Sequence, residues 1–130
     1  MKLHANDLGT CGVSQAFYAG TVKFDTEGIA DGVKICDIPK GLIFTKAVAN
    51  VKTAFNAATT NVLTVGFNTD KNELIGASDI TEGTAGTYAK EIWVEGGTND
   101  AIYAKYTQTG ATATAGEAEI YLMVVPAPID

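Results

Sequence analysis

The chain has 130 residues, of which 46% are hydrophobic and 18% are charged, and its formal net charge is −6. This length predicts one domain that can bury a core without disulfide or metal staples. The acidic balance and the scattered basic residues argue against nucleic acid as a direct partner, because binding DNA or RNA requires clustered Lys and Arg. The same observation argues against a polybasic membrane-binding patch.

The first 15 residues carry no clean hydrophobic period, so the sequence predicts an N-terminal arm over residues 1–15 and a β-sandwich domain over residues 16–130. The arm lacks the apolar centre of a signal peptide. No apolar run approaches the ~20 residues that a membrane helix needs. We therefore expect synthesis and folding in a cytoplasm. Leu3, Leu8 and Val13 are the expected apolar anchors of an arm that contacts another molecule. The alternative is that the arm folds back on its own domain.

From residue 16 onward, short runs of period two alternate with turn signals, which is typical of strands. The expected strands cover residues 17–24, 33–38, 42–55, 62–67, 73–80, 88–95, 101–107 and 117–125, with 73–80 the weakest. The third run loses its alternation around Ala47–Ala49, which predicts a bulge or two strand segments. Residues 51–60 also fit a short helix, but Thr59, Thr60 and Asn61 favour a loop. About eight strands at this spacing predict an all-β, jelly-roll-like antiparallel sandwich.

Alternation within these runs assigns an inward and an outward face to each strand. The expected core consists of Val22, Phe24, Leu63, Val65, Ile92, Val94, Ile102, Ile120, Leu122 and Val124. Trp93 falls on the opposite phase, between Glu91 and Glu95, and is a candidate contact residue for a protein or a sugar. The alternative is that the assigned alternation is off by one residue, or that the strand is covered on both faces. Glu117 and Glu119 share one strand face, which indicates a solvated surface.

No residue pattern points to catalysis or to a metal. Neither Ser14 nor Ser78 lies in a Gly-x-Ser-x-Gly nucleophile elbow. His4 lies in the unpatterned arm, where a general base would have no fixed partner. Cys11 and Cys36 are expected to be reduced, although a disulfide between them stays open, and together with His4 they are too few to form a metal site. We therefore predict no enzyme activity, no catalytic residue and no cofactor.

One polar segment approaches the spacing of a calcium-binding loop. Asn68, Asp70, Asn72 and Asp79 occupy offsets 1, 3, 5 and 12 of that template. The template requires glycine at offset 6 to make its sharp turn, and this chain has Glu73 there. The segment is therefore better explained as an exposed polar loop.

Three stretches together resemble a known class of protein. Residues 37–43 read Asp-Ile-Pro-Lys-Gly-Leu-Ile, and residues 53–56 read Thr-Ala-Phe-Asn ahead of Leu-Thr-Val-Gly at 63–66. Residues 112–118 read Thr-Ala-Thr-Ala-Gly-Glu-Ala and lead into the final strand, 119–125. In this order and spacing, the stretches resemble small virion proteins of tailed bacteriophages, of the head decoration (auxiliary capsid) type.

The resemblance spans roughly residues 33–125 and implies a jelly-roll-like β-sandwich. It implies a non-catalytic structural virion protein that binds the outside of a phage capsid and stabilises the head. The implied partners are the major capsid protein and neighbouring copies of the chain, in a homo-oligomer for which a trimer is one option. The implied location is the capsid surface of the virion, after synthesis in the cytoplasm of a bacterial host. The quoted motifs carry no catalytic or contact residue.

Three other classes stay open at this point. A receptor- or carbohydrate-binding β-sandwich module of a phage fibre or tail predicts clustered exposed aromatic side chains. A secreted carbohydrate-binding module predicts a signal peptide. An enzyme predicts a cleft with convergent polar groups.

Overall fold

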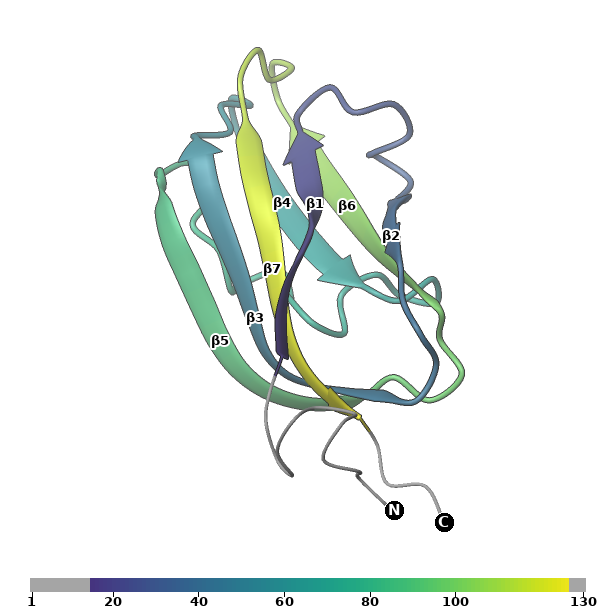
Figure 1. Cartoon of the computed structure of the whole chain (residues 1–130). Helices are drawn as coiled ribbons and strands as arrows, with labels where there is room; N and C mark the ends of the chain where they lie inside the picture. Colours follow the sequence, from purple (N-terminus) through teal and green to yellow (C-terminus); the bar gives the residue numbers. More distant parts are fainter. Residues whose placement is uncertain (1–14, 127–130) are drawn as a thin grey trace.

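Seven strands form the described part of the chain, residues 15–126 of a computed structural model (Figure 1). They are β1 (Gln15–Lys23), β2 (Val33–Asp37), β3 (Leu42–Thr53), β4 (Thr60–Gly66), β5 (Gly86–Glu95), β6 (Ala101–Thr109) and β7 (Glu117–Pro126). Each strand coincides with one of the runs of period two. Within residues 15–126, no helix is both long enough and apolar enough to cross a membrane.

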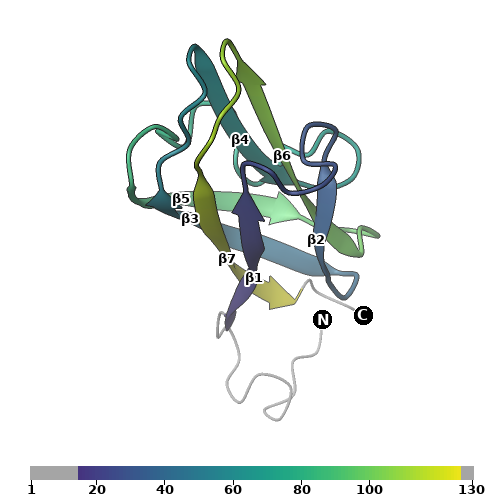
Figure 2. The same ribbon diagram turned by 90° about the horizontal axis from the view of Figure 1, so that it is seen from above.

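The strands form two layers, which Figures 1 and 2 show from two directions. One sheet has the order β1-β7-β3-β5 and the other has the order β2-β6-β4, and all neighbours are antiparallel. Every step from one strand to the next along the chain changes sheet. This connection pattern confirms the expected all-β, jelly-roll-like sandwich.

The expected strand over residues 73–80 does not form, so the count of about eight strands is corrected to seven. The segment makes a single antiparallel bridge beside β4, in which Ile75 donates to the carbonyl of Val65 at 2.9 Å and accepts from its amide at 3.0 Å. A turn follows at once, because the Asp79 carboxylate accepts the Gly76 N–H at 2.7 Å. The segment thus takes the place of an edge strand, but its polar turn ends the ladder after one residue.

Inward-facing residues of both sheets make one core. Val22, Leu63, Val65, Ile102, Ile120, Leu122 and Val124 are buried as predicted. Phe24, Ile92 and Val94 are only partly buried against the core, because Phe24 follows the end of β1 and the other two lie on the edge strand β5. The prediction missed Phe44, Phe55 and Tyr106. The rings of Phe55 and Tyr106 pack with their centroids 4.8 Å apart, so the loop after β3 adds an aromatic side chain to the core.

Bulges occur at places the sequence did not predict. β3 is one continuous strand whose register shifts between Phe44 and Lys46, and again between Val51 and Thr53. The stretch from Ala47 to Val51 is regular, so the expected slip around Ala47–Ala49 is wrong by a few residues. A further shift lies between Tyr18 and Gly20 in β1. Each bulge re-aims the side chains that follow it.

The two loops that the sequence singled out are held by side chains. Residues 54–59 form the loop that the sequence favoured over a helix. In the polar loop after β4, the Glu73 carboxylate accepts the N–H groups of Phe67 at 2.8 Å and Asn72 at 3.1 Å. Gly66 permits this approach, because a Cβ at that position would lie 2.5 Å from the backbone nitrogen of Glu73. The glutamate therefore closes this loop on itself.

Candidate functional site

The outer face of the four-stranded sheet gathers the exposed aromatic residues of the described chain. Tyr18, Trp93 and Tyr121 are 52%, 68% and 37% exposed. Tyr18 pairs directly with Tyr121 in the register of β1 and β7. On β7, the alternation buries Ile120 and Leu122, so Tyr121 points away from the core. These three aromatic residues therefore share one solvent-facing surface.

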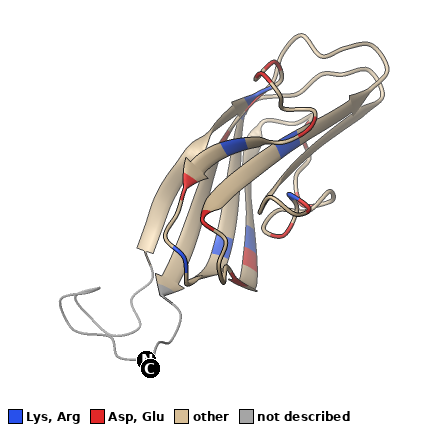
Figure 3. Ribbon diagram, turned by 90° about the vertical axis from the view of Figure 1, so that its right-hand side faces the viewer, with Lys and Arg blue, Asp and Glu red and all other residues tan. Residues whose placement is uncertain are grey.

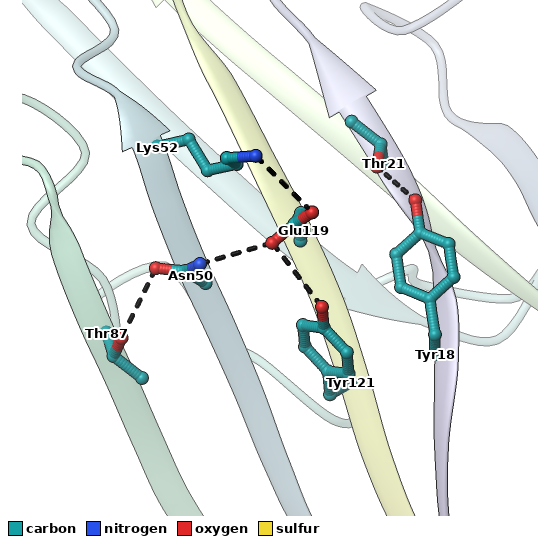
Figure 4. Close-up of polar contacts among 7 residues, drawn as sticks. All are labelled: Tyr18, Thr21, Asn50, Lys52, Thr87, Glu119 and Tyr121. Atoms are coloured by element: carbon teal, nitrogen blue, oxygen red, sulfur yellow. Dashed lines mark hydrogen bonds and ion pairs between the residues drawn. The ribbon is translucent and has the colours of Figure 1, made fainter.

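A row of polar residues crosses this face in register through all four strands. It runs from Thr21 on β1 through Glu119 on β7 and Asn50 on β3 to Thr87 on β5. The Thr87 hydroxyl donates to Asn50 Oδ1 at 3.2 Å, and Asn50 Nδ2 donates to Glu119 Oε1 at 3.1 Å (Figure 4). We call Thr21, Glu119, Asn50 and Thr87 the polar row.

Glu119 is the centre of this row. Lys52 Nζ lies 3.7 Å from its Oε2, and the Tyr121 hydroxyl donates to its Oε1 at 3.4 Å. The Glu119 side chain is only 23% exposed, although it lies on the open face. Desolvation and then the Glu119 charge raise the pKa of the Tyr121 hydroxyl above its usual value.

Tyr18 and Tyr121 form what we call the tyrosine pair. Their ring centroids are 5.4 Å apart and the ring planes meet at 50°. Figure 4 shows the rings side by side on β1 and β7, with both hydroxyls pointing toward the polar row. The Tyr18 hydroxyl bonds that of Thr21, and the Tyr121 hydroxyl bonds Glu119. The row thus anchors two aromatic rings while their apolar surface remains open to solvent.

Trp93 lies on the same face at the edge strand β5. Its neighbours Ile92 and Val94 pack against the core, which confirms that the tryptophan faces away from it. Its role as a partner contact stays a prediction. Across the sheet, the Glu91 carboxylate next to Trp93 along the strand lies 4.0 Å from Lys46 Nζ.

The other predicted contact residues, Leu3, Leu8 and Val13, lie outside the described residues, as do His4 and Cys11. Cys36 is half-buried on β2, where burial raises the pKa of its thiol. The sequence-based analysis did not single out Tyr18 or Tyr121. The alternation of β7 gave a signal for Tyr121, which lies between two predicted core residues.

The site is an open surface. Residues 15–126 enclose no pocket, and in that range no three His, Cys, Asp or Glu side chains are grouped to bind a metal ion. Figure 3 shows acidic and basic residues interspersed over strands and loops rather than gathered by sign. The chemistry that this face offers is therefore stacking and hydrogen bonding.

The sequence matches no family model and no curated protein. Among solved structures, it is similar to a chain of the cyanophage Pam1 capsid asymmetric unit, with 24% identity over 88% of this chain and 85% of that chain and a TM-score of 0.64. It is also similar to a chain of the acidic stable capsid of the Helicobacter pylori bacteriophage KHP30, with 18% identity over 90% and 97% of the two chains and a TM-score of 0.52. The resemblance to phage virion proteins is thus confirmed at the level of the fold, which this chain shares with chains of two phage capsids.

Proposed function

We propose that this chain is a non-catalytic structural virion protein that binds the outside of a phage capsid and stabilises the head. The observation that carries the proposal is the similarity to a chain of the cyanophage Pam1 capsid, which covers 88% of this chain and 85% of that one. Because the alignment takes up most of both chains, the two are close in length. The similarity extends over nearly the whole sandwich of each chain, so the proposal rests on the fold as a whole rather than on a local motif.

A surface layer of this kind gains its strength from repetition. Many copies on one shell multiply modest contacts into stable attachment, so no deep pocket is required. The proposed partners are the major capsid protein and neighbouring copies of the chain. Two carboxylates beside β4, those of Glu82 and Glu73, hold backbone N–H groups of the fold. Glu82 accepts the amide of Leu63, and Glu73 accepts that of Phe67. We accordingly assign no catalytic residue.

We further propose that the arm, residues 1–15, makes an intermolecular contact in this layer. The first described strand, β1, is an edge of the four-stranded sheet. An extended segment can add itself to a strand edge of a neighbouring molecule through backbone hydrogen bonds. Leu3, Leu8 and Val13 would then fill apolar sites on that neighbour, and Trp93 would be a separate contact on the opposite edge strand.

The test of the proposed function is binding to heads. Purified chain is added to assembled heads that lack it, and bound protein is separated by density-gradient centrifugation and quantified by mass spectrometry. We expect saturation at a fixed number of copies per head, because a decoration site repeats with the shell lattice. Failure to sediment with heads, or recovery only with tails, would contradict the proposal.

A second candidate is a receptor- or carbohydrate-binding module of a phage fibre or tail. The specific observation in its favour is the clustering of Tyr18, Tyr121 and Trp93 on one face. Antibody labelling of intact particles in the electron microscope distinguishes the two candidates, since label on the head supports the first and label on the tail or fibres supports the second.

A further inference from the structure

We propose that the tyrosine pair and the polar row together bind an uncharged saccharide chain. The proposal goes beyond capsid attachment and does not depend on it. The same face could bind a saccharide whether the protein is part of a head or part of a fibre. Its ring platform is Tyr18 and Tyr121. Its hydroxyl-binding groups are Glu119, Asn50 and Lys52.

The tyrosine pair supplies the stacking surface. The face of an aromatic ring carries negative charge density and attracts polarised C–H groups, such as those on one side of a sugar ring. Exposed aromatics that occur singly are normal and need no explanation. Here two rings lie 5.4 Å apart on adjacent strands, and each is tied by its hydroxyl to a neighbour on the sheet. Holding the rings in place before binding reduces the entropy lost when a ligand stacks on them.

The polar row supplies acceptors and donors next to the rings. A sugar hydroxyl both donates and accepts, so it is best bound where a fixed acceptor and a fixed donor lie close together. The Glu119 carboxylate is held by Asn50 at 3.1 Å and Lys52 at 3.7 Å. Lys52 is only an ion-pair partner at this distance, so within the described chain one amide hydrogen of Asn50 and all three ammonium hydrogens of Lys52 make no hydrogen bond and can serve a ligand. The contacts therefore hold these side chains in place and still leave hydrogen-bond donors for a ligand.

The shape and charge of the face select among ligand classes. A small molecule needs a concave site that buries most of its surface, and the described residues form none. The charges beside the tyrosine pair are matched, with Lys52 against Glu119 and Lys46 against Glu91, so the face offers little attraction to a polyanion.

A dry protein interface is also disfavoured at the centre of this face. Covering the Glu119–Lys52 pair with protein would remove the water that solvates both charges without supplying new hydrogen-bond partners. The cores of protein interfaces are accordingly depleted of charged residues. A chain of sugar units replaces that water with hydroxyl groups. Tyr121 is in register with Ala89 on β5, and Trp93 lies four residues beyond Ala89. Trp93 is therefore about 10 Å from Tyr121 across the sheet and about 13 Å along it, so only an extended chain could contact both.

The test uses the full chain in native gels that contain a dissolved polysaccharide. Dextran, laminarin, mannan, xylan and galactan are the neutral probes, and alginate is the charged one. We expect at least one neutral polysaccharide to retard the protein. Tyr121→Ala and Tyr18→Ala should each weaken the retardation by about tenfold. Tyr121→Phe keeps the ring and should retain most of the binding.

Thr107→Ala, on the exposed side of the other sheet, is the matched control and should bind like the parent. Thermal melts show that each variant is folded before its binding is compared. The proposal is overturned if no neutral polysaccharide retards the parent or if alginate alone does. It is also overturned if Tyr121→Ala binds undiminished, or if sedimentation shows that this substitution separates a dimer while no polysaccharide binds. None of these results depends on heads, so they do not bear on capsid attachment.

Discussion

The buried carboxylate of Glu82 accepts the backbone N–H of Leu63 on β4 at 2.8 Å. Glu82 lies in the loop between β4 and β5 and is 5% exposed. Its own carbonyl accepts the N–H of Phe55 at 2.9 Å. One residue thus ties this loop both to a central part of the core and to the segment after β3, at the expense of removing a carboxylate from water.

This contact makes stability depend on pH. Burial raises the pKa of Glu82 above its usual 4.5. The stability that this group contributes is therefore fully present below about pH 4.5 and is lost as the pH rises through the raised pKa. Glu82→Gln keeps an oxygen acceptor for Leu63 and cannot ionise, so its stability relative to the parent should increase from pH 4.5 to neutrality. Urea unfolding at a series of pH values measures this difference, and parallel profiles would contradict it.

Glu82→Ala serves as the comparison. It leaves the Leu63 amide buried without an acceptor and should cost about 1–3 kcal/mol relative to the parent near pH 4.5. The cost should be smaller at neutral pH, where the parent has lost the stability linked to Glu82. A neutral effect would mean that the hydrogen bond is replaced by water.

The inward face of β7 carries a large share of the core. Ile120 and Leu122 are both completely buried. Truncation of either residue to alanine should lower the free energy of unfolding by about 2–5 kcal/mol, from lost burial and the cavity left behind. Thr107→Ala, at an exposed position of β6, should stay within about 0.5 kcal/mol. Chemical denaturation followed by circular dichroism measures both, and a helical spectrum would contradict the fold itself.

Gly66 is required by close approach rather than by its dihedral angle. A Cβ there would meet the backbone nitrogens of Glu73 at 2.5 Å and Asn72 at 2.6 Å, which a rotamer change cannot relieve. We expect Gly66→Ala to cost about 1–3 kcal/mol through forced backbone shifts. Gly76→Ala, whose new Cβ would lie 3.5 Å from Asp79, is the matched control and should be nearly neutral. Equal melting temperatures for the two variants would count against this account of the loop.

Neither cysteine should be essential. The Cys36 thiol is half-buried, and burial raises its pKa, so it should react slowly with a disulfide reagent at neutral pH and faster after unfolding. The double variant Cys11→Ser, Cys36→Ser should still fold. Titration of the unreduced native protein checks the redox state. The prediction would be wrong if the titration found a disulfide between Cys11 and Cys36, or if the double variant could not fold.

Deletion of residues 1–12 tests the arm. If the arm is an intermolecular contact, the truncated chain should melt close to the parent temperature and lose head binding or self-association, because β1 begins only at Gln15. Calorimetry and sedimentation measure the two properties separately. A collapse of stability with binding preserved would make the arm a part of the fold.

The sequence by itself determined the strands and most of the core. Seven of the expected runs are strands, and on β7 the simple alternation placed Ile120 and Leu122 inside and left Tyr121 outside. This is possible because period two is a property of adjacent residues and of the pleated backbone. Trp93 was placed correctly for the same reason, since its neighbours Ile92 and Val94 pack against the core.

The tertiary structure alone decided where that alternation breaks. Tyr18 is an even number of residues from the buried Val22, so a regular strand would turn both the same way. The bulge between Tyr18 and Gly20 turns the tyrosine outward instead. A bulge depends on what the strand meets across the sheet, and β7 is about a hundred residues further along the chain. The candidate site also depends on the tertiary structure, because Asn50 and Glu119 lie 69 residues apart in sequence and meet only when β3 pairs with β7.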